Sequence, residues 1–397
     1  MADPSAQLAP AGEAATPLAQ ERFPDDVVSI CLSGGGYRAM LFHTGALWRL
    51  HQIGLLQKIA IFSSVSGGSI ANGWLALKWP ELTRKGASFE SVFVPGIRAM
   101  ARTTVDVWAV LHGLWTGSIA AKVAAAYDRV LFKGATLRDL PAAPLFVYDS
   151  SNLQTGALWR FTREYMGDYR VGYVQQPDIR LAVAVGASSA FPPILSPVIL
   201  RPPVDRYDPN YPTSLTEPRF RSRIVLADGG VYDNLGLEPI IKRARTVLAS
   251  DGGSPFKRRS KPCGFWPVQL VRVLKCEDNQ VRGLRKRDLV ERYHLCTTLE
   301  AANFPIWTTP ETAATARKGT YWGITTKVAN YPTAPGLHCP PDATRRLATL
   351  STRLANIGDA DQEALINWGY AVCDYAIRAH VDTTIAPATT WPYAQGL

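Results

Sequence analysis

The sequence of 397 residues is poor in cysteine and has no CxxC pair. The cysteines are spread along the chain, at Cys31, Cys263, Cys276, Cys296, Cys339 and Cys373. Closely spaced pairs are typical of structural zinc sites, and dense even sets are typical of small disulfide-bonded secreted domains. The pattern therefore favours free thiols in a reducing compartment. It offers no candidate metal site, and we expect no cofactor.

Long hydrophobic runs are also missing. Residues 1–24 have neither a basic start nor an apolar stretch, so we expect a flexible tail without a secretory signal. The segment 105–126 comes nearest to a membrane span, but three polar residues, Asp106, His112 and Lys122, make it a poor one. It is either a buried helix or an amphipathic lid that touches lipid. We expect a cytoplasmic protein that at most associates peripherally with a membrane.

Acidic residues are outnumbered, which gives a net charge of +10. Such a balance suggests an anionic partner: a lipid surface, a nucleic acid or an acidic protein. Basic residues gather in 257–259 and 282–292. No nucleic-acid-binding motif accompanies them, so we expect no nucleic acid and leave the role of both stretches open.

The first eighty residues read as strand, turn, helix, strand, turn, helix. Apolar β-type runs at 27–32 and 59–65 each meet a glycine-bearing turn, and helical patterns follow at 38–53 and after residue 66. This alternation predicts an α/β fold with parallel strands.

Further elements are predicted downstream. We expect strands at 144–149, 157–161 and 223–227, and helices at 179–186 (capped by Asp178), 237–245, 278–293, 342–356 and 359–380. No linker separates two independent domains. We divide the chain into the tail, a core at 25–250 and a mostly helical extension at 251–397.

The first glycine-rich turn is Ser33-Gly34-Gly35-Gly36-Tyr37-Arg38. Three glycines let bare backbone N–H groups approach a ligand oxygen, and a helix start adds the positive end of its dipole. The turn suits an oxyanion, which is either a phosphate or the charge that develops during acyl transfer. It lacks the GK[ST] ending of a P-loop, and Ala39 replaces the third glycine of a dinucleotide fingerprint.

The second turn, Ser64-Val65-Ser66-Gly67-Gly68-Ser69, has a serine between a strand and a helix, followed by two glycines. This is the arrangement of a nucleophile elbow, although Ser64 replaces the usual first glycine. A glycine- and serine-rich turn without chemistry remains the alternative.

The third turn, Asp228-Gly229-Gly230, places a carboxylate at a strand end. A serine hydroxyl needs a neighbouring base, and an aspartate can act as one. Asp228 could instead cap a turn, a role that Asp233 and Asn234 could share. A Ser-His-Asp triad is disfavoured, because His294, which follows Asp228 in the permitted order, lies in a charged helical stretch, and His338 and His380 lie in C-terminal segments.

Together the three turns resemble the patatin-like phospholipases and the related catalytic domain of cytosolic phospholipases A. Similar segments follow in family order: YDRVLFKGATLRDL, SSNLQTGALWRF, GASSAFPPILSPV and LADGGVYDNLG. The resemblance is good over residues 27–250 and weaker beyond.

The resemblance implies a three-layer α/β/α fold with a Ser-Asp dyad, in which Ser66 is the nucleophile and Asp228 the general base. It implies oxyanion donors at Gly34, Gly35, Gly36 and Gly67. Arg38 would support the loop or a phosphate headgroup. The implied activity is hydrolysis of lipid carboxylic esters through an acyl-enzyme. The alternatives are an inactive lipid- or phosphate-binding protein on the same fold and a nucleotide-binding protein. The oligomeric state is not predicted.

Overall fold

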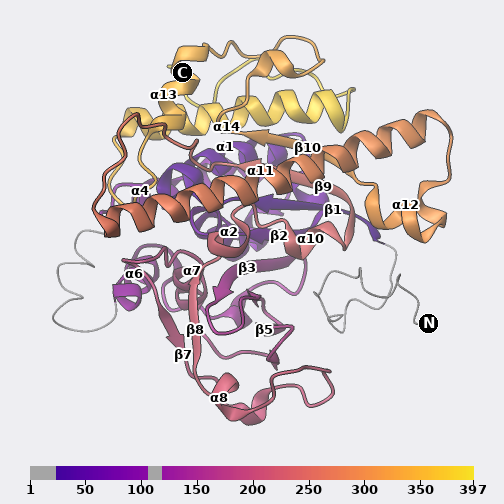
Figure 1. The fold of residues 1–397 in the computed structure, drawn as a ribbon. Coiled ribbons are helices and arrows are strands. Elements are labelled where there is room, and N and C mark those ends of the chain that lie inside the picture. Colours follow the sequence, from indigo (N-terminus) through magenta and orange to yellow (C-terminus); the bar gives the residue numbers. More distant parts are fainter. Residues whose placement is uncertain (1–23, 106–118) are drawn as a thin grey trace.

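The computed structural model describes residues 24–105 and 119–397. Its central feature is a mixed sheet with the strand order β10-β9-β1-β2-β3-β4-β5-β6, and β8 pairs with both β3 and β7 (Figure 1). Strands β10, β9, β1, β2 and β3 run parallel to one another. The remaining pairings are antiparallel.

The parallel half consists of buried strands with alternating faces. It contains β1 (Asp25–Leu32), β2 (Ile59–Ser64), β9 (Ala244–Asp251) and β10 (Lys318–Gly323). In β1, Ile30 and Leu32 join one hydrophobic core, whereas Cys31 joins another. Because successive side chains of a strand point to opposite faces, the sheet separates two cores.

Helices cover both faces of this sheet. The larger core packs under α1 (Gly36–Gln52), α2 (Gly67–Leu82) and α14 (Asp359–His380). The smaller core lies under α10 (Glu238–Ile241) and α11 (Trp266–Ala301), which crosses in front of the sheet in Figure 1. The predicted three-layer α/β/α class is thereby confirmed.

The other half of the sheet is antiparallel. It contains β3 (Leu145–Asn152), β4 (Leu158–Phe161), β5 (Tyr165–Asp168), β6 (Gly172–Gln175), β7 (Val198–Leu200) and β8 (Ile224–Asp228). Strand β2 leaves β3 where Ser64 pairs with Tyr148. Strand β8 then joins β3 from the opposite direction and ends with Asp228 opposite Ser150.

Shorter helices complete the described part of the chain. They are α3 (Phe89–Val92), α4 (Val94–Ala101), α6 (Ile119–Tyr127), α7 (Leu181–Ser188), α8 (Pro218–Arg221), α9 (Gly230–Asp233), α12 (Pro310–Thr315) and α13 (Pro341–Thr349). In the described residues we find no helix with the length and hydrophobicity of a membrane span. Most of the 105–126 segment lies outside the described residues, so its two interpretations stay predictions.

Three local predictions were wrong. The helix expected at 342–356 ends at Thr349, because the backbone of the next residue, Leu350, is extended. The helix expected at 237–245 ends at Ile241, and β9 begins at Ala244, because the β-prone run Thr246–Val247 pairs with β1. Asp178 does not cap α7, whose N-cap is Arg180. The sequence pattern also missed β10, which adds residues beyond 250 to the same sheet. The division of the chain at residue 250 stays a prediction.

Candidate active site

Ser66 occupies a strained turn between β2 and α2. Its backbone has φ 51° and ψ −118°, and α2 begins at the next residue. Positive φ is uncommon for a residue with a Cβ, and it occurs where a strand turns sharply into a helix behind a nucleophile. A Cβ on Gly67 would lie 2.0 Å from the carbonyl oxygen of Gly36, so no larger residue fits after the serine. Ser66 is half-buried, while its immediate neighbours are buried.

Hydroxyl groups support this elbow from below. The Ser66 amide donates to Ser188 Oγ at 3.0 Å, at the end of α7. Ser188 Oγ lies 2.9 Å from Ser69 Oγ, which donates to Ser64 Oγ at 3.0 Å. Asn72 Nδ2 donates to the same Ser64 oxygen at 2.9 Å. These buried bonds tie the turn to two neighbouring elements and fix its backbone.

Asp228 ends β8 and is only 2% exposed. Burial raises the pKa of its carboxyl to about 7, while hydrogen bonds from the Gly230 amide and the Ser66 side chain partly oppose the rise. The Gly230 amide donates to Asp228 Oδ1 at 2.7 Å. The Asp228 amide donates to the Ala190 carbonyl at 2.9 Å. A carboxyl group with a pKa of about 7 is present in both its protonated and its ionised form at neutral pH.

The glycine-rich turn lies against the elbow. Gly35 and Gly36 have φ of 140° and 59°, and α1 begins at Gly36. The Gly34 amide donates to the Asn234 carbonyl at 3.0 Å and is therefore occupied. Within the described part of the chain, the amides of Gly35, Gly36 and Gly67 have no acceptor. The first turns of α1 and α2 thus present free N–H groups beside Ser66, where the helix dipoles favour negative charge.

The Arg38 side chain forms hydrogen bonds with distant segments of the fold. Its Nη1 donates to Ser254 Oγ, the Ala348 carbonyl and the Leu350 carbonyl at 2.9, 3.0 and 2.8 Å. Its Nη2 donates to the Gly252 carbonyl at 2.7 Å. The side chain is fully buried, and burial lowers the pKa of its guanidinium to about 10. These contacts join the start of α1 to the segments around Gly252 and Ala348, and the two predicted roles of Arg38 stay predictions.

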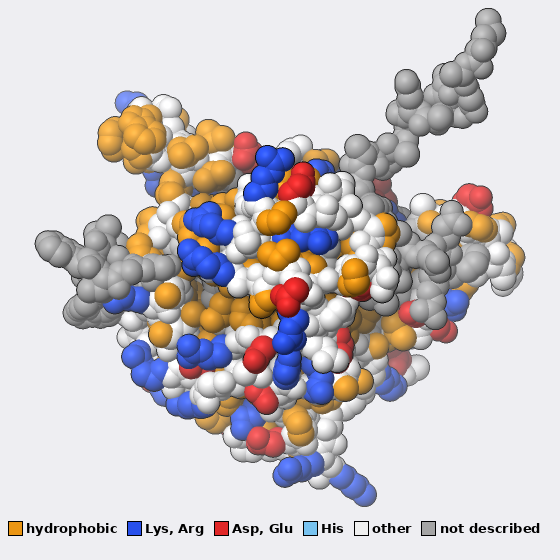
Figure 2. Space-filling view, turned by 90° about the horizontal axis from the view of Figure 1, so that it is seen from below, with side chains coloured by type: hydrophobic (Ala, Val, Ile, Leu, Met, Phe, Trp, Pro, Cys, Tyr) orange, Lys and Arg blue, Asp and Glu red, His pale blue; other side chains and the backbone are white. Residues whose placement is uncertain are grey.

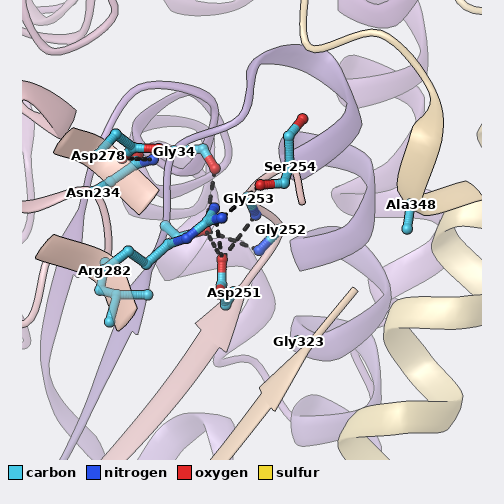
Figure 3. Close-up of polar contacts among 12 residues, drawn as sticks. Gly34, Asn234, Asp251, Gly252, Gly253, Ser254, Asp278, Arg282, Gly323 and Ala348 are labelled. Atoms are coloured by element: carbon cyan, nitrogen blue, oxygen red, sulfur yellow. Dashed lines mark hydrogen bonds and ion pairs between the residues drawn. The ribbon is translucent and has the colours of Figure 1, made fainter. Parts of the chain in front are cut away.

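An ionic network lies behind the glycine-rich turn (Figure 3). Asp251 Oδ1 accepts from the Gly253 amide at 2.8 Å and from Ser33 Oγ at 3.3 Å. Arg282 of α11 approaches the same oxygen at 3.9 Å. Burial alone would raise the pKa of Asp251, but Arg282, the Tyr321 hydroxyl and the Gly253 amide hold it below its ordinary value. The network anchors the turn to α11.

Asn234 is the second link from the turn to α11. Its carbonyl holds the Gly34 amide, and its Nδ2 donates to Asp278 Oδ1 at 2.8 Å. The adjacent Asp233 is fully buried and accepts from the amides of Leu237 and Glu238 at 2.7 and 2.8 Å. Asp233 therefore holds a turn, the structural role that its sequence position suggested.

His43 lies beneath the turn in α1. Burial lowers its pKa to about 4, so the ring is neutral at pH 7. Nε2 lies 2.9 Å from the Ser33 carbonyl and Nδ1 lies 2.8 Å from Ser250 Oγ. A carbonyl only accepts, so Nε2 carries the proton and Nδ1 accepts from the hydroxyl. His43 is a structural histidine, and His294 is exposed on α11.

The basic stretch 282–292 is partly built into the fold. Arg282 and Arg285 have only 11% and 23% exposed side chains. Arg285 pairs with Glu238 at 2.7 Å and lies 3.6 Å from Asp233. A cavity of about 440 Å³ opens beside Arg282, separate from Ser66 and Asp228. Its charged lining is Asp251, Arg258, Arg282 and Lys286. Within the described ranges, we find no cluster of metal-ligating side chains.

Comparison with known proteins identifies the family. The sequence model described as Patatin-like phospholipase matches residues 30–241, more than half of the chain. The chain therefore belongs to the patatin-like phospholipase family. The match includes all three glycine-bearing turns. No curated protein matches the sequence.

Solved structures resemble this chain at low sequence identity, and one of them has a TM-score above 0.5. Human GIVD cytosolic phospholipase A2 matches 89% of this chain and 58% of its own, with 14% identity and a TM-score of 0.53. Its complex with methyl gamma-linolenyl fluorophosphonate gives the same coverage, 15% identity and a TM-score of 0.49. VipD from Legionella pneumophila gives 90% and 67% coverage, 12% identity and a TM-score of 0.36. The chain thus spans 58% of the length of the human enzyme.

Sequence reasoning did not find the residues that support the site. Ser188 belongs to the family-like segment GASSAFPPILSPV, for which the sequence predicts no particular contact, and it predicts no contact of Asn234, Asp251 or Asp278 with the turn. The Asp251-Gly-Gly run repeats the Asp-Gly-Gly pattern at the end of a strand, and this signal was available. The pairing of Arg282 with Asp251 was not, because it depends on how α11 packs.

Proposed function

We propose that the protein is a lipid acyl hydrolase that cleaves carboxylic ester bonds with a Ser66-Asp228 dyad. The observation that carries this proposal is the placement of the two residues: a serine with positive φ in a strand-to-helix elbow lies close enough to a buried carboxyl group to affect its pKa, which burial raises to about 7. Membership of the patatin-like phospholipase family supports the same reaction class.

In the first half-reaction, the ester carbonyl lies above the elbow. Ser66 Oγ attacks the carbonyl carbon while Asp228 accepts the hydroxyl proton. The oxyanion forms beside the free amides of Gly35, Gly36 and Gly67 and gains from two helix N-termini. The intermediate collapses, the C–O bond breaks, and Asp228 returns its proton to the leaving alcohol. Ser66 is left acylated.

In the second half-reaction, water replaces the alcohol. Asp228 accepts a proton from the water as the water attacks the acyl carbonyl, and the same amides hold the second oxyanion. Collapse releases the fatty acid and restores the Ser66 hydroxyl with the proton from Asp228. The scheme needs no group beyond the side chains and amides of this site.

The remaining predicted residues take supporting roles in this proposal. Gly34 joins the oxyanion hole only if its amide leaves the Asn234 carbonyl, so we assign it to close packing beside Ser66. Arg38 holds the loop from behind. The lipid meets the site at a membrane surface, and a cytoplasmic location stays a prediction.

The proposal is tested by covalent labelling. Purified wild-type protein is incubated with a fluorophosphonate, beside Ser66→Ala, Asp228→Asn and the neighbouring-serine control Ser189→Ala. Intact mass gives the adduct. We expect adducts on the wild type and Ser189→Ala, none on Ser66→Ala, and strongly slowed labelling on Asp228→Asn.

A substrate panel follows on the same proteins. It contains a diacyl phospholipid, a lysophospholipid, a neutral glyceride and an acyl thioester, and released fatty acid is measured. Labelling that survives Ser66→Ala would show that another serine is the nucleophile. Absence of both labelling and fatty-acid release would favour the alternative, an inactive lipid- or phosphate-binding protein on this fold.

A further inference from the structure

Residues 256–276 form a projection that we call the spur. This segment contains six basic residues and no acidic one. The basic residues are Lys257, Arg258, Arg259, Lys261, Arg272 and Lys275. The spur also contains five of the large hydrophobic residues that are exposed in the structure: Phe265, Trp266, Val268, Leu270 and Val273.

The direction of α11 places the spur beyond the sheet. Tyr293 Oη donates to the Val247 carbonyl in the middle of β9, whereas Arg282 meets Asp251 at the end of that strand. The helix therefore runs antiparallel to the strands, and its first turns lie past their carboxyl ends. At 1.5 Å per residue, the helix extends about 18 Å from Asp278 back to Trp266. This end of α11 reaches past the sheet in Figure 1.

The spur contributes nothing to the described hydrophobic cores. In α11 the buried residues are Leu289, which packs against the sheet, and Cys296, which packs against Ile306 and Ala316. Trp266 is 71% exposed and Phe265 is 62% exposed. The loop before the helix folds back on it, since Arg272 stacks 4.7 Å from the Phe256 ring and donates to the Lys257 carbonyl at 3.3 Å. The spur is thus an ordered projection with an uncovered apolar surface.

The spur emerges at the active-site edge. Asp278 is bonded to Asn234, which holds the glycine-rich turn beside Ser66. A second exposed apolar group flanks the same site: Phe191 and Ile194 follow α7, and Val231 follows the Asp228 turn. In Figure 2 hydrophobic side chains gather on the lobe at the upper left, at the place of this end of α11 in Figure 1, with Lys and Arg side chains nearby.

We propose that the spur docks the enzyme on the surface of an anionic lipid bilayer, with Phe265 and Trp266 in the interface and the six cations on the headgroups. Tryptophan is favoured at the headgroup level, and cations near an anionic leaflet add to the attraction. A protein partner would need acidic groups around an apolar groove, whereas a bilayer supplies both features over an extended plane. This deepens the proposed function by naming its docking surface.

Binding to vesicles tests the proposal without relying on hydrolysis. All proteins carry Ser66→Ala so that the lipids stay intact. Cosedimentation is measured with vesicles of phosphatidylcholine alone and of phosphatidylcholine mixed with phosphatidylserine. We expect clear preference for the mixed vesicles, lost at high salt. Emission from Trp266, isolated by subtracting the Trp266→Phe spectrum, should shift to the blue on binding.

Two variants separate charge from insertion. Neutralising Arg258, Arg259 and Lys261 with glutamine should reduce binding to mixed vesicles by roughly a hundred-fold, at about five-fold per cation. The double variant Phe265→Ala/Trp266→Ala should weaken binding to both vesicle types by about ten-fold or more. These side chains are exposed, so unfolding curves measured by circular dichroism should not differ from those of the parent protein.

The matched control neutralises three exposed cations at the opposite edge of the sheet. Lys58 precedes β2, and Arg84 and Lys85 follow α2. Their replacement by glutamine should leave binding within a few-fold of the parent. If the spur and control variants lost binding affinity equally, the net charge alone would explain binding, and the proposal would be overturned.

Two further results would also overturn it. Wild-type affinity for mixed vesicles could be no higher than for phosphatidylcholine and unaffected by either spur variant. Alternatively, sedimentation could show a dimer that Phe265→Ala/Trp266→Ala dissociates, in which case a second copy covers the spur. The proposed function can fail separately, because fluorophosphonate labelling of Ser66 uses neither vesicles nor the spur.

Discussion

Ser66 and Asp228 meet because two strands approach β3 from opposite directions. Strand β2 runs parallel to β3. Its last paired residue is Ser64, which lies opposite Tyr148 and precedes Ser66 by two positions. Strand β8 runs antiparallel along the same strand and ends with Asp228 opposite Ser150. The two strand ends therefore face each other across a short gap in the pairing of β3, which brings the Ser66 side chain close enough to the Asp228 carboxyl group to affect its pKa.

This contact predicts the pH dependence of Ser66 reactivity. The Asp228 pKa is raised to about 7, and only the ionised carboxylate can accept the serine proton. The rate of fluorophosphonate labelling should therefore rise with pH and level off above a midpoint near 7. Labelling rates by intact mass across this range give the measurement. A flat profile in the wild type, or the same step in Asp228→Asn, would remove Asp228 as the base.

The same pKa predicts a stability effect. An aspartate whose pKa is raised from 3.8 to about 7 on folding binds more protons in the folded state, so folding weakens as pH rises between these values. Asp228→Asn removes the buried charge. Its free energy of unfolding should exceed that of the wild type above pH 7, by up to about 4 kcal/mol. The difference should vanish below the ordinary aspartate pKa.

Urea unfolding at several pH values checks this. The difference in free energy of unfolding between Asp228→Asn and the wild type should increase with pH as the wild-type carboxyl group ionises. A variant that is less stable than the wild type above pH 7 would mean that the ionised carboxylate is fully compensated by its hydrogen bonds.

Ser188 should position the elbow. Ser188→Ala removes the acceptor of the Ser66 amide, and leaving that buried donor unpaired costs about 1–3 kcal/mol of stability. We expect slower labelling of Ser66 with an unchanged pH midpoint. The neighbouring Ser189→Ala is the matched control, because Ser189 Oγ donates to the Val185 carbonyl of the preceding helix α7 and not to the elbow in the described part of the chain. Equal effects of the two variants would assign the loss to α7 packing.

Replacing Arg38 should lower the stability of the fold rather than change the substrate preference. Arg38→Lys cannot reach its four acceptors and leaves buried carbonyls unpaired, which should lower the free energy of unfolding by about 3 kcal/mol or more. Labelling by a small fluorophosphonate without a phosphate headgroup should fall in parallel. Arg84→Lys, at an exposed position, should change neither.

A headgroup role for Arg38 would give another result. The variant would then keep its stability and its labelling by the small probe, and lose activity only on phospholipids relative to neutral glycerides. Unfolding curves and the substrate panel distinguish the two roles.

The sequence by itself determined the local geometry of the site. Three glycine-bearing turns after β-type runs predicted an α/β fold, because close backbone approach and sharp turns depend on few residues. Gly67 illustrates this, since a Cβ there would meet the Gly36 carbonyl. The strand ends at 32, 64 and 228 and the long helix 359–380 follow the predicted pattern closely.

Only the tertiary structure decided how these pieces act on one another. The raised pKa of Asp228 comes from burial, and burial comes from the docking of β8 against β3. Two further contacts join residues that are far apart in the chain. The Gly34 amide donates to the Asn234 carbonyl, and Arg38 donates to the Gly252 carbonyl. The basic residues of 256–292 divide into ion pairs around Arg282 and an exposed spur at 256–276 because α11 crosses the sheet edge between them. Such contacts depend on packing between distant segments, which no local sequence pattern encodes.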